Sequence, residues 1–181
     1  MPSDKTSGEP TANVQNSQNS QNSQGELNIP MVGELAPDFT LPDERGGAVH
    51  LRDLLGKQVI LYFYPKDDTP GCTVEACSFR DAWQEMQAEG IVVLGISRDS
   101  VKSHQKFANK YGLPFTLLAD VDSDVARSYG VWVQKQRYGR SYMGVARTTF
   151  YIRPDGRVGH VWTNVKPEGH ALRVFEFASK N

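Results

Sequence analysis

Apolar runs and amphipathic segments alternate along most of the chain, and their order predicts its secondary structure. Short apolar runs with the length of buried strands occur at 59–64, 91–97 and 115–119. Segments with helical patterning or helix-boundary residues follow these runs at 69–88, 100–111 and 123–129. The chain then offers two strands around a Pro-Asp-Gly turn and a last helix, at 148–153, 157–163 and 167–179.

This order predicts an α/β domain with parallel crossovers early in the chain and an antiparallel hairpin late. The sequence β-α-β followed by β-β-α is typical of a thioredoxin-like fold with insertions, in which helices flank a central mixed sheet. The stretch 1–27 lacks the pattern and holds three copies of Asn-Ser-Gln. Such a stretch buries too little surface to offset its chain entropy, so we expect a disordered tail before one folded domain at 28–181.

The longest helical segment begins at a distinctive site. Thr69 is a suitable N-cap and Pro70 suits the first helical position, so the Thr69 hydroxyl is expected to accept a hydrogen bond from the Cys72 N–H. A thiol in the first turn of a helix lies at the positive end of the helix dipole, which stabilises its thiolate form. Cys72 is therefore a candidate nucleophile, the alternative being an inert core cysteine.

Cys72 and Cys77 are the only cysteines in the chain, and helical spacing places them on different faces. Cys72 begins an apolar stripe that is expected to face the core, whereas Cys77 lies on the polar side. Two residues five apart on a helix have Cα atoms about 8.6 Å apart, and a disulfide needs about 7 Å or less. The two thiols can therefore bond only if the first turns unwind. Cys72 and Cys77 therefore either form a redox pair of this kind or are two unrelated thiols that never react with each other.

Charge and composition narrow the classes of partner. The chain has 20 Lys and Arg against 21 Asp and Glu, which gives no reason to expect nucleic acid or an anionic membrane as a partner. No run approaches 18 apolar residues, and the first residues lack the apolar core of an export signal. In such a chain, a close pair of cysteines is typical of a catalytic role. We therefore expect a cytoplasmic protein.

A reactive thiolate also needs groups that stabilise charge on the leaving atom. The Thr69 hydroxyl and the first backbone N–H groups of the helix can donate locally. Arg147 is the candidate cation because it lies directly before the strand 148–153, where a strand end can deliver a side chain to a site. Other arginines compete for this role on position alone, namely Arg80, Arg140 and Arg153.

The eight residues from Pro65 to Cys72 read PKDDTPGC and resemble the Pro-x-x-x-Thr-x-x-Cys motif of peroxiredoxins. The continuation GCTVEAC, with a second cysteine five residues on, is similar to the subgroup called bacterioferritin comigratory protein or peroxiredoxin Q, which is of the atypical two-cysteine type. Further similar stretches lie at 113–120, 138–144 and 147–152. The resemblance runs from about residue 33 to residue 177, which is the whole expected domain.

The resemblance implies a thioredoxin-like peroxidase that reduces hydrogen peroxide and organic hydroperoxides and needs no cofactor. Cys72 would be the peroxidatic cysteine and Cys77 the resolving one, joined in an internal disulfide. Thr69 and Arg147 would bind and polarise the peroxide, and Pro65 would shield the oxidised sulfur from water. Members with this spacing are usually reduced by thioredoxin or a similar dithiol protein, and many are monomers.

Three other functions would share some of these features. A metal site at the two cysteines lacks ligands, because none of the four histidines lies near them in sequence. A thioredoxin-like dithiol oxidoreductase would carry a Cys-x-x-Cys motif, which this chain does not have. A peroxide sensor or holdase would use the same reactive Cys72, so the sequence separates it poorly from a peroxidase.

Overall fold

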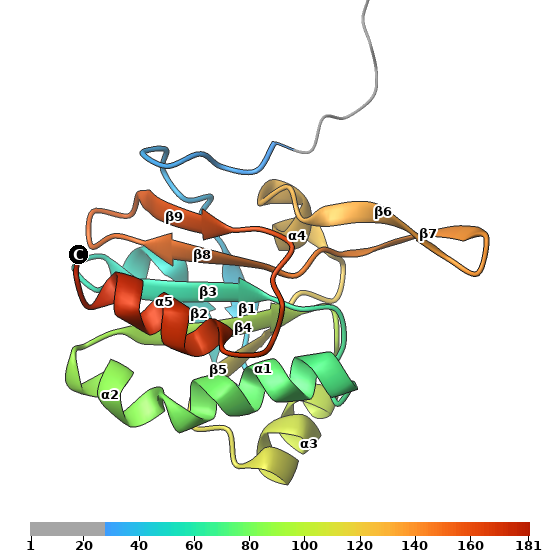
Figure 1. The fold of residues 1–181 in the computed structure, drawn as a ribbon, viewed down its shortest axis with the longest axis horizontal. Helices are drawn as coiled ribbons and strands as arrows, with labels where there is room; N and C mark the ends of the chain where they lie inside the picture. The colour runs from blue at the N-terminus through green and yellow to red at the C-terminus, as the bar shows by residue number, and fades with distance from the viewer. Residues whose placement is uncertain (1–27) are drawn as a thin grey trace, which may run out of the picture.

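The computed structural model describes residues 28–181, so the tail expected at 1–27 lies outside the described residues. A five-stranded mixed sheet forms the centre, in the order β5-β4-β3-β8-β9 (Figure 1). Its strands are β3 (Val59–Phe63), β4 (Val92–Ser97), β5 (Thr116–Ala119), β8 (Thr148–Ile152) and β9 (Val158–Trp162). The helices are α1 (Pro70–Asp81), α2 (Trp83–Ala88), α3 (Val101–Tyr111), α4 (Asp124–Ser128) and α5 (His170–Ala178).

The strand directions agree with the order read from the sequence. β3 pairs in parallel with β4, and β4 pairs in parallel with β5, so each connection crosses over through a helix. β8 runs antiparallel to β3 and forms a hairpin with β9. The predicted α/β layering and late hairpin are therefore confirmed.

Side chains of β3 alternate between two apolar cores, one on each face of the sheet. Ile60 and Tyr62 point into a core built with α1, α2, α3 and α5. Leu61 and Phe63 point into the other core, which includes residues of α4. Burial on both faces explains why the strand reads as a continuous apolar run.

The segment 69–88, expected as one helix, forms two. α1 ends at Asp81 and α2 begins at Trp83, and Ala82 between them is still right-handed, at φ −89° and ψ −3°. Neither glycine nor proline stands at this break. The expectation of one uninterrupted helix was therefore wrong, and no residue of the usual helix-breaking kind marks the position.

Two ribbons and a short helical turn escaped the sequence analysis. A small ribbon pairs β1 (Thr40–Pro42) with β2 (Ala48–His50), and a 3₁₀ turn, η1 (Leu51–Leu54), follows. A second hairpin pairs β6 (Trp132–Arg137) with β7 (Arg140–Val145) and reaches away from the central sheet (Figure 1). No helix within residues 28–181 is long and apolar enough to cross a membrane.

Candidate active site

Cys72 lies in the first turn of α1, directly after the loop that leaves β3. Thr69 is the N-cap residue and Pro70 the first helical residue, as predicted. Cys72 is only 1% exposed, and Ala76, Phe79 and Met86 of the same stripe are also buried. The apolar face of the helix therefore carries the Cys72 sulfur towards the core.

The Thr69 hydroxyl has a different partner from the expected one. It donates a hydrogen bond to the backbone oxygen of Lys66 over 2.8 Å and does not cap the helix. The intervening Asp68 has a left-handed backbone, with φ 54°, which makes a tight turn in this loop. Because the hydroxyl proton is committed to the backbone, the Thr69 oxygen is left as a hydrogen-bond acceptor at the site.

Arg147 is the arginine that the structure brings to Cys72. Its Nη2 donates to Cys72 Sγ over 3.3 Å, and its Nη1 lies 3.4 Å from Glu75 Oε2. Gly71 makes room for the guanidinium, because a Cβ there would lie 3.1 Å from Nη2. A guanidinium in this position can donate to the sulfur and to an oxygen atom bound beside it. Of the competing arginines, Arg80 bonds the Tyr111 backbone, Arg153 pairs with Asp155 and Arg140 is exposed.

Glu75 is completely buried beside this pair, although it lies on neither stripe used in the sequence analysis. Burial raises the pKa of Glu75 to about 7, while Arg147 partly opposes this shift. Its Oε1 has no hydrogen-bond partner among the described residues, and neither has the hydroxyl of buried Tyr62. Burial raises the pKa of Tyr62 well above its usual value, and the charges of Glu75 and Cys72 add to the shift. The guanidinium thus acts in a poorly solvated region, where charge interactions are strong.

A cavity of about 510 Å³ lies over the Cys72 sulfur and is lined by four of the five predicted site residues. These four are Pro65, Thr69, Cys72 and Arg147. The β6–β7 hairpin, which the sequence analysis did not anticipate, closes the opposite wall. The sequence signal for this hairpin was the turn at Tyr138 and Gly139, whose φ angles are 51° and 73°.

Cys77 does not line this cavity. It is partly buried and borders a separate groove between α1 and α5 with Val74, Leu172 and Phe175. Both thiols are free, and the helix between them is intact. On intact helical geometry their Cα atoms stand too far apart for a disulfide.

A buried polar network holds the loop that precedes Cys72. Asp67 accepts hydrogen bonds from the Tyr64 hydroxyl over 2.6 Å and from the Ser103 hydroxyl over 2.8 Å. His104 Nδ1 lies 2.7 Å from the same carboxylate, and its Nε2 lies 2.9 Å from the backbone oxygen of Leu118. The network ties the loop to α3 and β5, and sequence reasoning did not find it, because its members lie far apart in the chain.

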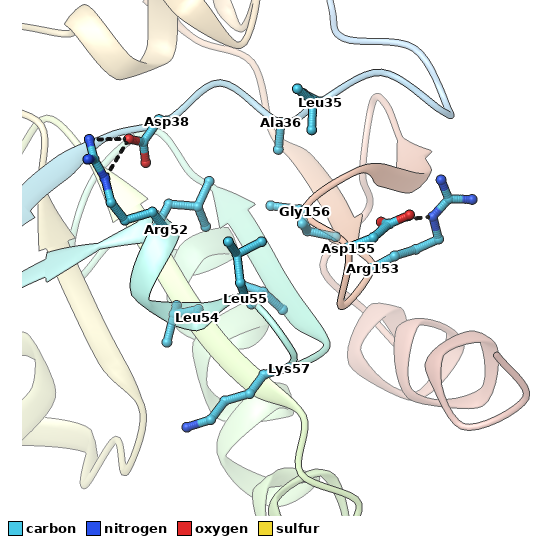
Figure 2. A pocket seen from close by; sticks show the side chains of 13 residues that line it. Leu35, Ala36, Asp38, Arg52, Leu54, Leu55, Lys57, Arg153, Asp155 and Gly156 are labelled. Atoms are coloured by element: carbon cyan, nitrogen blue, oxygen red, sulfur yellow. Dashed lines mark hydrogen bonds and ion pairs between the residues drawn. The ribbon is translucent and has the colours of Figure 1, made fainter.

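A second cavity, of about 270 Å³, lies at the other end of β3 (Figure 2). Leu35, Leu54 and Leu55 line it, and two ion pairs lie at its rim, Arg52 with Asp38 and Arg153 with Asp155. It contains no thiol and no residue of the PKDDTPGC motif. The cavity over Cys72 is therefore the candidate active site.

Comparison with known proteins identifies the family. The AhpC/TSA family model matches residues 32–161. A putative peroxiredoxin bcp of Coxiella burnetii is 58% identical over 143 residues, covering 79% of this chain and 95% of the relative. Peroxiredoxin Bcp of Escherichia coli K12 is 44% identical over 144 residues, covering 80% of this chain and 92% of the relative.

Solved structures agree with these sequence relatives. A mutant of peroxiredoxin Q from Xanthomonas campestris superposes with a TM-score of 0.76 at 39% identity, covering 78% of this chain and 90% of that one. This match confirms the predicted thioredoxin-like fold, with its mixed sheet between helices. The chain therefore belongs to the AhpC/TSA family and, within it, to the thiol-dependent peroxidases known as peroxiredoxin Bcp or peroxiredoxin Q.

Proposed function

We propose that this chain reduces hydrogen peroxide and organic hydroperoxides through Cys72. Cys77 then forms an internal disulfide with the oxidised Cys72. The observation that carries the proposal is the hydrogen bond from Arg147 to the Cys72 sulfur, beside a cavity that a small hydroperoxide can enter. The related bacterioferritin comigratory protein of Xanthomonas campestris has alkyl peroxide reduction activity, which supports organic hydroperoxides as substrates here.

In the first step the Cys72 thiolate attacks one oxygen of the hydroperoxide, and the O–O bond breaks. The sulfur becomes a sulfenic acid, and the other oxygen leaves as an alkoxide or hydroxide that takes up a proton. Arg147 is oriented to donate to the reacting oxygens, which stabilises the charge that develops on them. The free lone pairs of the Thr69 oxygen suit it to accept the hydrogen bond of the hydroperoxide O–H.

In the second step the Cys77 thiol loses its proton and its sulfur attacks the sulfenic sulfur. An S–S bond forms, the S–O bond breaks, and the leaving hydroxide takes up a proton to become water. The intact helix keeps the two sulfurs apart, so this step requires the first turns of α1 to unwind. Pro65, at the wall of the cavity, would limit the access of water to the sulfenic acid before resolution.

A dithiol protein of the thioredoxin kind would then return two electrons and restore both thiols. Because the disulfide forms within one chain, no second copy is needed, and we infer a monomer. Turnover of this kind suits the cytoplasm, where thioredoxin keeps thiols reduced. The role of the reaction there would be antioxidant defence and redox homeostasis.

A stopped-flow titration of the fully reduced protein with hydrogen peroxide, followed by mass spectrometry, tests the proposal. The expected product has lost two hydrogen atoms and contains a bridge between Cys72 and Cys77. Repeated turnover with thioredoxin and thioredoxin reductase would separate an enzyme from a single-use sensor. A Cys72→Ser variant that consumes peroxide as fast as the wild type would overturn the assignment of the nucleophile.

A further inference from the structure

The cavity over Cys72 is more basic than the reduction of hydrogen peroxide requires. Five cations line it, namely Lys66, Arg98, Lys135, Arg137 and Arg147. Its one acidic residue is Asp99, whose carboxylate accepts hydrogen bonds from the Asp67 backbone and the Ser97 hydroxyl. Because the whole chain has a net charge of only −1, the fold has gathered these cations in one place.

Lys135 is the cation whose position is hardest to explain without a ligand. Its aliphatic stem lies across Gly144 of the neighbouring strand, where a Cβ would come within 3.3 Å of Lys135 Cδ. Lys135 lines the same cavity as Cys72 and Arg147. Burial lowers the pKa of Lys135, the positive charge of Arg147 lowers it further, and the charge of Cys72 partly opposes the shift. Within residues 28–181, no carboxylate pairs with it. A half-buried cation without a counter-ion gains stability when an anion binds.

Arg98 adds a second positive charge to the same cavity, on an exposed side chain. Its guanidinium stacks 5.1 Å from the centre of the Trp132 ring, which belongs to β6. A cation held over an aromatic face is preorganised, and an anion that binds it loses less freedom than at a mobile side chain. No ion pair of Arg98 is found in the part of the chain that the structure describes.

The remaining wall of the cavity is apolar and the volume is large. Tyr142, Met143 and Val145 of β7 line it. The cavity measures about 510 Å³, whereas a water molecule takes up about 30 Å³ in the liquid. Hydrogen peroxide therefore fills only a small part of this volume. A larger molecule with an apolar body and an anionic end matches both the walls and the charges.

We propose that the Cys72 cavity selects organic hydroperoxides that carry a carboxylate, with Lys135 and Arg98 as the specificity-determining residues that receive it. The O–O bond would lie at Cys72 and Arg147, the apolar body against the β7 wall, and the carboxylate at the two cations. This inference rests on the proposed function and names a substrate class for the same site.

A matched pair of substrates tests the inference, namely cumene hydroperoxide and its derivative with a para-carboxylate. The rate of Cys72 oxidation is measured by stopped flow for both compounds in the wild type and in Lys135→Gln. We expect the wild type to prefer the carboxylate by about three- to tenfold, as befits a partly screened ion pair. The preference should fall towards unity in Lys135→Gln and should fall in part in Arg98→Gln.

Arg140→Gln is the control, because Arg140 belongs to the same hairpin, carries the same charge and does not line the cavity. It should keep the wild-type preference. Equal rates for the two compounds in the wild type would overturn the inference, as would equal losses of preference in Lys135→Gln and Arg140→Gln. Failure of both compounds and of hydrogen peroxide to oxidise Cys72 would instead overturn the proposed function.

Discussion

Arg147 stands 75 residues after Cys72 in the chain, yet its guanidinium donates a hydrogen bond to the Cys72 sulfur. The register of the central sheet accounts for this contact. Thr148, the first residue of β8, pairs with Phe63, the last residue of β3. The residue before β8 and the loop after β3 therefore emerge at the same edge of the sheet. The pairing of two antiparallel strands thus delivers the cation to the thiol.

Removing the guanidinium should slow the oxidation of Cys72. We expect Arg147→Ala to cost about 2–4 kcal/mol at the chemical step, as for the loss of one oxyanion donor. Arg147→Lys should recover only part of the rate, because one ammonium cannot reproduce the paired contacts to Cys72 and Glu75. Stopped-flow oxidation by hydrogen peroxide measures both variants. A wild-type rate in Arg147→Ala, or an equal loss in Arg140→Ala, would contradict the role given to Arg147.

Removing the second thiol should stop the cycle after one turnover. Cys77→Ser should still consume about one equivalent of peroxide, because Cys77 does not line the cavity at Cys72. The product should be a Cys72 sulfenic acid that dimedone traps and mass spectrometry detects. Loss of this first turnover would show that Cys77 does more than resolve, and sustained turnover with thioredoxin would show that it does not resolve at all.

The buried Glu75 carboxyl should make stability depend on pH. Burial raises its pKa from 4.5 to about 7. Between these values the folded protein keeps a proton that the unfolded chain has released, so the free energy of unfolding falls as the pH rises and levels off above 7. Glu75→Gln lacks this ionisation, and from pH 5 to pH 8 it should gain roughly 2–3 kcal/mol relative to the wild type.

Urea unfolding of the reduced protein at several pH values measures this difference. Glu85→Gln, an exposed change on α2, is the control and should follow the wild type across the range. A constant difference between Glu75→Gln and the wild type from pH 5 to pH 8 would show that Glu75 does not titrate in this window.

The pair formed by Asp67 and His104 should matter more for stability than an exposed pair of the same length. The two side chains are almost completely buried and lie 2.7 Å apart. His104→Leu should destabilise the fold by about 1–3 kcal/mol, because the buried Asp67 carboxyl and the buried Leu118 carbonyl both lose a hydrogen-bond partner. Lys110 and Asp68 lie equally close but exposed, so Lys110→Met should leave urea unfolding near that of the wild type. Similar losses in both variants would mean that burial does not set the difference.

Local signals in the sequence were enough to predict much of the architecture. α3 begins after Ser100, whose hydroxyl accepts a hydrogen bond from the Ser103 N–H, and ends at Gly112 with φ 60°. The turn after Arg153 closes the β8–β9 hairpin as its Pro-Asp-Gly residues indicate. Capping residues, glycines and proline act within a few positions, so their effect can be read without the rest of the chain.

The missed features depend on contacts between distant segments. The β6–β7 hairpin carries polar residues such as Lys135 and Arg137 on strands that cover the cavity, so it shows no simple alternation of apolar and polar positions. Glu75 is buried against Arg147, which lies 72 residues further along the chain. The Thr69 hydroxyl could cap a helix or bond the preceding loop, and only the turn at Asp68 decides between these partners.

The break at Ala82 limits how much of the structure has to unfold during a catalytic cycle. An unravelling that starts at Pro70 can propagate along twelve residues of α1 before it reaches a point where the helical ladder is already interrupted. α2 lies beyond that point, with Met86 fully buried in the core. The proposed disulfide would therefore require the unfolding of α1 alone, while the rest of the core stays assembled and α1 can refold against it once the bridge is reduced.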